Sequence, residues 1–322
     1  MYSHKRKFAV LLILVFISFC LFLGCKSADA EDKNLNGSFA IRFFSLGDGE
    51  CTAIRFPDGK NAVIDCGGAD KSDKITSSLE EFLSGKIDYL VLSSIEEENI
   101  GAIIPVIDKF EIGTAFVPYK NGIEEFPVYS EVLEKLKSKS KVQNAELSSF
   151  AIGEDYFMGF LSPESLAAEK VLGSGADSVS NKDISNLSPI TYLKYKNFQA
   201  VFLGDSSAES QNEVYNKFFT GIYDYYYRAA AIDLTAVNLI KLSNHGSYSH
   251  FSEKFFTQFR PDYSVISVSG VNPNSYPSTA TLKALYKIDP ETEILRTDVL
   301  GDITVYVDKE SNVKIVTESK FI

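Results

Sequence analysis

Polar residues occupy the junction between an apolar strand and a helix in LVLSSIEEENIGA, residues 90–102. Ser94, Glu96, Glu98 and Asn99 stand at the point where α/β folds usually place their chemistry. Carboxylate and amide oxygens are ligands for hard divalent cations such as Mg²⁺ or Mn²⁺, whereas zinc prefers imidazole and thiolate. An acidic run of this kind can also be a solvated loop, so the pattern alone leaves both interpretations open.

Two further candidates follow later apolar runs. Asp205 ends VFLGD and either binds a cation or caps the helix expected from Ser206 onward. His245, in NHGS, either binds a cation or hydrogen-bonds its own loop. The other histidines are His4 and His250, and a dinuclear zinc centre of the usual kind needs more imidazoles than this.

The elements that must position these residues alternate between strand and helix patterns. Residues 39–66 have the period of β-strands, 72–85 that of a helix, 87–94 that of a strand and 99–110 that of a helix. Strand patterns also cover 188–205, 236–242, 262–269 and 301–316. This alternation predicts a sheet with helices packed on it.

Two cysteines flank one expected hairpin, CTAIRFPDGKNAVIDC. Asp58-Gly59 is a strong signal for a two-residue hairpin turn, and counting outward from it places Cys51 nearly opposite Cys66. In an oxidising compartment such a pair can form a disulfide. Two small buried residues that never bond fit the pattern equally well.

The N-terminus has the pattern of an export signal. Three basic residues precede an apolar run, residues 8–24, which ends at Cys25. LFLGC resembles the lipobox of bacterial lipoproteins. We therefore expect residues 1–24 to be a signal peptide, Cys25 to carry lipid, and the polar residues 25–38 to tether an exported body to the bacterial cell membrane. The alternative is an uncleaved anchor with an incidental cysteine.

Charge makes nucleic acid an unfavoured partner. The chain has 32 basic and 43 acidic residues, and residues 1–24 hold only Lys5, Arg6 and Lys7 among them, so the remainder has a net charge of −14. Proteins that bind nucleic acid usually present a basic surface to the phosphates. The expected partners are therefore the membrane, through the lipid, and an unknown ligand or protein.

Several phrases together resemble a known family. IRFFSLGDGECTAIRFPDGKNAVIDCGG, IDYLVLSSIEEENIGA, SPITYLKYKNFQAVFLGD, LSNHGSYS and ILRTDVLGDITV are similar, in sequence and order, to the metallo-β-lactamase-fold domain of the ComEC competence-protein family. The resemblance covers about residues 39–308. It implies an α/β (α+β) fold, an αββα sandwich formed by residues 39–322, with the four segments of the site at one edge.

The same resemblance implies that most metal ligands are missing. The family's motif H-x-H-x-D-H coincides with Ser94, Glu96, Glu98 and Asn99. Asn244-His245 replaces a histidine pair, Tyr276 stands at a later histidine, and Ser45 and Glu50 occupy two acidic positions. Of the implied ligands only Asp205 and His245 remain.

Two hypotheses follow for the function. The first is a pseudoenzyme without a cofactor, in which the old metal cleft binds a ligand or protein or serves as scaffold. The second is a hydrolase of phosphodiesterase or nuclease type that uses a single Mg²⁺ or Mn²⁺ held by Glu96, Glu98, Asp205 and His245 with Asn99; Asp65 is a further candidate.

Overall fold

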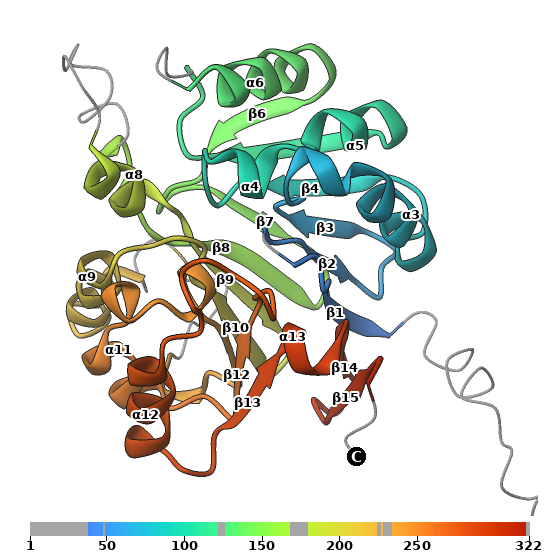
Figure 1. Cartoon of the computed structure of the whole chain (residues 1–322). Coiled ribbons are helices and arrows are strands. Elements are labelled where there is room, and N and C mark those ends of the chain that lie inside the picture. The colour runs from blue at the N-terminus through green and yellow to red at the C-terminus, as the bar shows by residue number, and fades with distance from the viewer. Residues whose placement is uncertain are drawn as a thin grey trace, which may run out of the picture. The chain divides into compact units, whose positions relative to one another are not determined.

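Two mixed β-sheets face each other and carry helices on their outer surfaces (Figure 1). The computed structural model describes residues 38–47, 49–121, 126–167, 180–223, 227 and 234–319. These residues belong to one compact unit, Ser38–Ile322. The expected αββα sandwich is therefore confirmed.

The first sheet has eight strands. They are β1 (Phe39–Phe43), β2 (Thr52–Arg55), β3 (Asn61–Ile64), β4 (Ile87–Val91), β5 (Ile112–Val117), β6 (Lys141–Asn144), β14 (Ile303–Val307) and β15 (Val313–Thr317). Their order is β15-β14-β1-β2-β3-β4-β5-β6. The pairs from β3 to β6 are parallel, and the others are antiparallel.

The second sheet has seven strands. They are β7 (Phe150–Ile152), β8 (Tyr156–Ser162), β9 (Ile190–Tyr195), β10 (Phe198–Phe202), β11 (Leu239–Lys241), β12 (Tyr263–Ile266) and β13 (Glu293–Arg296). Their order is β13-β12-β11-β10-β9-β8-β7, with parallel pairs from β10 to β13. Both sheets therefore bring carboxyl ends of parallel strands to one edge, where α/β proteins usually bind ligands.

Helices cover both outer faces. On the first sheet lie α3 (Ser72–Phe82), α4 (Glu97–Ile100), α5 (Ile103–Lys109) and α6 (Pro127–Lys139); on the second lie α9 (Ala208–Phe218), α11 (Glu253–Phe259) and α12 (Thr279–Ile288) (Figure 1). Two short helices, α8 (Asn181–Leu187) and α13 (Thr297–Leu300), precede β9 and follow β13 respectively. Among the described helices none is long and apolar enough to cross a membrane.

Apolar side chains fill the space between the sheets. Phe39, Phe43, Phe116 and Phe160 are fully buried there, in a cluster that draws on both sheets. A second cluster joins the outer face of the second sheet to its helices, with Phe255 of α11 among its members. Each such side chain contributes about 1.5–3 kcal/mol relative to exposure, so this framework holds the edge loops in place.

The expected hairpin around Asp58-Gly59 is confirmed. β2 pairs with β3 so that Thr52 lies opposite Ile64, which puts Cys51 opposite the residue that precedes Cys66. Both thiols are buried and free, and the Cys66 thiol contributes to the raised pKa of Cys51. The structure thus places the two thiols close together across the hairpin, with no disulfide between them.

The predicted export signal lies outside the described residues. Residues 1–24, Cys25 and the tether as far as residue 37 belong to the part of the chain that the structure does not describe. The signal peptide, the lipid and the tether therefore stay predictions.

Candidate functional site

The loops after β3, β4, β10 and β11 bring the sequence-predicted residues together at one edge of the sandwich. Asn99 Nδ2 donates a hydrogen bond of 2.7 Å to Asp205 Oδ2, although the two residues are 106 positions apart. His245 Nε2 lies 3.8 Å from Glu98 Oε1, and the rings of His245 and Tyr276 lie 6.3 Å apart. Segments far apart in the sequence thus form one cleft.

Asn99 holds Asp205 in the floor of this cleft. Asn99 is fully buried at the start of the helical segment after β4, and its backbone oxygen accepts from Cys66 N at 2.9 Å. The orientation of its amide is set by Asp205, because only the NH₂ end can donate to a carboxylate. The other end, Asn99 Oδ1, is buried and has no hydrogen-bond partner among the described residues.

Asp205 does not cap the following helix, so that interpretation of the sequence is wrong. The cap of α9 is Ser207, whose hydroxyl accepts from Ser210 N. Asp205 lies three residues before the helix and turns inward, and its backbone N–H donates to Ser188 Oγ at 2.9 Å. Its carboxylate is thereby free to accept from Asn99.

A close approach between the two sheets depends on Gly204. Gly204 has φ +51, and a Cβ on it would lie 2.8 Å from Ser93 Cβ. A side chain here would push the β10 loop away from the β4 loop. The glycine therefore permits Asp205 to reach Asn99.

His245 is held from both sides by acceptors. Its Nδ1 donates to the Ser267 carbonyl at 2.8 Å and lies 3.5 Å from Glu50 Oε1, while its Nε2 faces Glu98. Burial by itself would lower the pKa of His245, but Glu98 and Glu50 outweigh it and raise that pKa to about 9. In this arrangement the ring is favoured as an imidazolium, which donates from both nitrogens to the acceptors around it.

A buried ion pair lies beneath His245. Lys241 Nζ, at the end of β11, contacts Glu50 Oε2, and both side chains are at most 5% exposed. Burial raises the pKa of Glu50, while Lys241 and His245 oppose that rise. Because Lys241 supplies a complete positive charge in contact, Glu50 needs no metal as a partner.

The carboxylate of Asp65 is also paired within the protein, in this case by hydrogen bonds from a neutral residue. It follows β3 with φ 55, and its carboxylate accepts from the backbone N–H of Ser93 at 2.8 Å and from the Ser93 hydroxyl. Burial raises the pKa of Asp65 well above its usual range, although both bonds from Ser93 oppose the rise. Asp65 is thus a brace between β3 and β4.

The remaining predicted residues lie at the exposed rim of the cleft or outside it. Glu96 and Glu98 are exposed, and partial burial, followed by Asp205 and Glu98, raises the pKa of Glu96. Ser94 is buried, and its hydroxyl accepts from Glu96 N at 3.2 Å. Ser45 hydrogen-bonds Asp302 and Thr297 instead of the members of the cleft.

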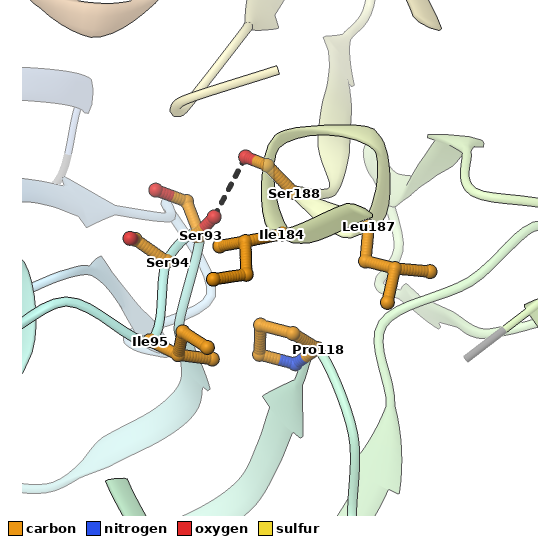
Figure 2. A pocket seen from close by; sticks show the side chains of 7 residues that line it. All are labelled: Ser93, Ser94, Ile95, Pro118, Ile184, Leu187 and Ser188. Atoms are coloured by element: carbon orange, nitrogen blue, oxygen red, sulfur yellow. Dashed lines mark hydrogen bonds between the residues drawn. The ribbon is translucent and has the colours of Figure 1, made fainter. Parts of the chain in front are cut away.

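Two hollows flank the centre. The one beside Ser94 is apolar and about 10 Å³, room for a single water. Figure 2 shows its lining by Ser93, Ser94, Ile95, Pro118, Ile184, Leu187 and Ser188, with the Ser188 hydroxyl donating to the Ser93 carbonyl at 2.7 Å. The one beside His245 is polar and about 110 Å³, and is lined by Glu98, Asn244, His245, Val268, Ser269, Asn272, Pro273, Asn274 and Tyr276.

The residues present do not fit the paired zinc ions that the resemblance in sequence implies. Within the described ranges, no group of three or more His, Cys, Asp or Glu side chains is arranged to hold a metal ion. Asp205 accepts from an amide, Glu50 pairs with an ammonium, and both ring nitrogens of His245 face acceptors. These three candidate ligands are thus engaged by the protein itself.

Comparisons with known proteins concern the fold alone. No protein-family model matches the chain, and no curated protein matches it in sequence. CmlA, a diiron β-hydroxylase from Streptomyces venezuelae, is similar in structure, with a TM-score of 0.50, 10% identity and coverage of 84% of this chain and 54% of CmlA. The metallo-β-lactamase-fold protein YhfI from Bacillus subtilis has a TM-score of 0.48 and 12% identity, and the match covers 86% of this chain and 100% of YhfI.

The two sheets with helices on their outer faces are the αββα sandwich expected of a metallo-β-lactamase-like fold, and CmlA is similar to it in structure. This chain spans about half of CmlA, and identities of 10–12% carry nothing about activity. The narrower resemblance to the ComEC family has no matching family model and stays a prediction.

Sequence reasoning missed Lys241, the residue that decides the charge of the cleft. Leu239, Ile240, Lys241 and Leu242 are all buried. A lysine within a continuous apolar strand is a signal in itself, because buried lysines are almost always paired. That signal predicts a carboxylate partner but does not identify Glu50, which lies 191 residues earlier.

Proposed function

We propose that the chain is an exported, lipid-anchored protein of the metallo-β-lactamase fold that does not hydrolyse substrates and uses its altered metal cleft to bind a ligand or a protein. The observation that supports this most is the bond from Asn99 to Asp205. A neutral amide satisfies the aspartate that a metal would otherwise need, so the protein closes the centre with its own side chains.

The polar hollow beside His245 supports a binding role. It is open to solvent, it has about 110 Å³, and its lining offers amides, a hydroxyl and a tyrosine ring. Asn272 braces its loop by donating to the Ser269 and Tyr276 carbonyls. A braced polar hollow of this kind presents hydrogen-bonding groups in fixed positions, as binding sites require.

One observation favours a second candidate, a hydrolase with a single Mg²⁺ or Mn²⁺. Asn99 Oδ1 is buried without a hydrogen-bond partner in the described part of the chain, and Glu96 lies within electrostatic reach of Glu98 and Asp205. Oxygen ligands of this kind suit a hard cation. The bond that Asn99 already donates to Asp205 argues against it, because a cation at Asp205 would have to displace that amide.

Divalent cations and model substrates separate the two candidates. With the purified full-length chain, we expect no hydrolysis of a phosphodiester or β-lactam model substrate above the protein-free rate, and no rise in melting temperature with Mn²⁺ or Mg²⁺. The single-cation hydrolase instead requires a rise that disappears in Glu96→Ala/Asp205→Ala. Cation-dependent turnover lost in that double variant would establish the second candidate.

The membrane anchor has its own test. Lipid on Cys25 would hold the protein in the membrane fraction, so Cys25→Ser should move nearly all of it to the soluble fraction. Cys51→Ser, which leaves the processing signal intact, should stay with the membrane. A native protein that is soluble and begins at Met1 would contradict the lipoprotein proposal.

A further inference from the structure

The two cysteines of the folded body lie at adjacent ends of the β2–β3 hairpin. Residues 39–322 contain two cysteines, Cys51 and Cys66. The strand register places Cys51 opposite Asp65, the residue that precedes Cys66. The Cys66 thiol is near enough to contribute to the raised pKa of Cys51, so the hairpin brings the two thiols close together.

The backbone fixes both thiols in this arrangement. Cys51 O accepts from Phe44 N at 3.1 Å, and Cys66 N donates to Asn99 O at 2.9 Å. Asp65, which lies opposite Cys51 in register, has φ 55 and turns the chain there. Both side chains are fully buried, so the contact does not depend on a mobile surface segment.

We propose that Cys51 and Cys66 are a cross-linking site and form an intramolecular disulfide in the exported protein. The two thiols each lose a proton, and their two electrons reduce a disulfide of an external donor, such as a thiol–disulfide oxidoreductase, to two thiols. The structure holds the reduced form of this pair. The location in an oxidising compartment rests on the export proposed above.

The pair must be oxidised before the domain closes. Burial, followed by Cys66, raises the pKa of the Cys51 thiol well above its usual range. Thiolate, the form that attacks a disulfide, is therefore scarce in the folded protein. The cross-link forms during folding and is then protected from reduction by the same burial.

The cross-link would join the two segments that carry the buried carboxylates of Glu50 and Asp65. Cys51 follows Glu50, the partner of Lys241, and Cys66 follows Asp65, the partner of Ser93. A disulfide here ties the end of the β1–β2 loop to the end of β3. It would keep the buried carboxylates of Glu50 and Asp65 in fixed positions relative to each other.

The sequence makes a direct test available. Trypsin cleaves after Arg42, Arg55, Lys60 and Lys71, so Cys51 and Cys66 fall in separate peptides, 43–55 and 61–71. Full-length protein from the membrane fraction, alkylated at lysis and digested without reduction, should give these peptides as one species 2 Da lighter than their sum. Reduction of the purified protein should lower its melting temperature by roughly 5–10 °C, since the closed loop has about 15 residues.

An alanine double variant and refolding in a glutathione buffer provide the controls for this test. Cys51→Ala/Cys66→Ala should melt near the reduced protein and show no effect of reductant. Exported protein with both thiols alkylated would overturn the cross-link and leave the proposed function standing. If the chain is not exported, refolding the purified chain with oxidised glutathione still tests the cross-link. A disulfide that survives excess reduced glutathione would support the proposal, and free thiols would overturn it.

Discussion

Asn99→Asp should destabilise the protein by about 3–5 kcal/mol at neutral pH, the usual cost of an uncompensated buried charge. The substitution places a second carboxylate at the position from which the amide donates to Asp205 at 2.7 Å. Two carboxylates this close share one proton, so the loss should shrink as the pH falls toward 4. Mn²⁺ or Zn²⁺ should then raise the melting temperature of the variant but not of the wild type, because a cation can bridge the two acids.

Asn99→Leu is the matched control for this change. It removes the same hydrogen bond without adding a charge, so it should lose about 1–3 kcal/mol. Acid should recover less stability than in Asn99→Asp, because only one buried carboxylate is then unpaired, and divalent cations should not stabilise it. Chemical denaturation at pH 4 and 7, with and without cation, measures all of these differences. Equal stability of Asn99→Asp and wild type at pH 7 would show that Asp205 is not held by Asn99.

Lys241→Met should be the other severe substitution. It leaves Glu50, at most 5% exposed, without its ammonium partner, and breaking one side of a buried pair costs about 3–5 kcal/mol. The folded-state pKa of Glu50 is already raised by burial and would rise further without Lys241. A raised acid pKa favours folding below that pKa, so the gap between variant and wild type should be smallest near pH 4–5 and widen as the pH rises.

The double variant Lys241→Met/Glu50→Leu provides the control. Replacing both partners removes the unpaired charge, and buried pairs can often be exchanged for apolar residues at little cost. We expect it to recover most of the lost stability and to lose the steep pH dependence. A double variant as unstable as Lys241→Met would mean that packing of the lysine stem, and not charge, causes the loss.

The sequence was sufficient for the framework because its signals are local. The Asp58-Gly59 turn predicts the β2–β3 hairpin, and apolar periodicity predicts the alternation of strands and helices. The meeting of Asn99 with Asp205 came from resemblance to a family and not from local pattern. Spacing along the chain could not have provided it, since 106 residues separate the two.

The chemistry of the centre was less accessible from the sequence. Whether a carboxylate faces a cation, an amide or a hydroxyl depends on which loop lies opposite, as Glu50, Asp205 and Asp65 show. The helix cap is similar: Asp205 and Ser207 are both good caps by type, and only the backbone path selects Ser207. The role of each residue that the sequence left open thus depends on which distant residue it pairs with.

The zinc content of the purified chain tests the central claim most directly. The full-length protein should be expressed with added zinc, purified without chelator, dialysed and measured by elemental analysis beside Asn99→Asp. The account predicts far less than one zinc per chain, because Asp205, Glu50 and His245 are all engaged by other groups of the protein. One or two zinc ions retained per wild-type chain would contradict it.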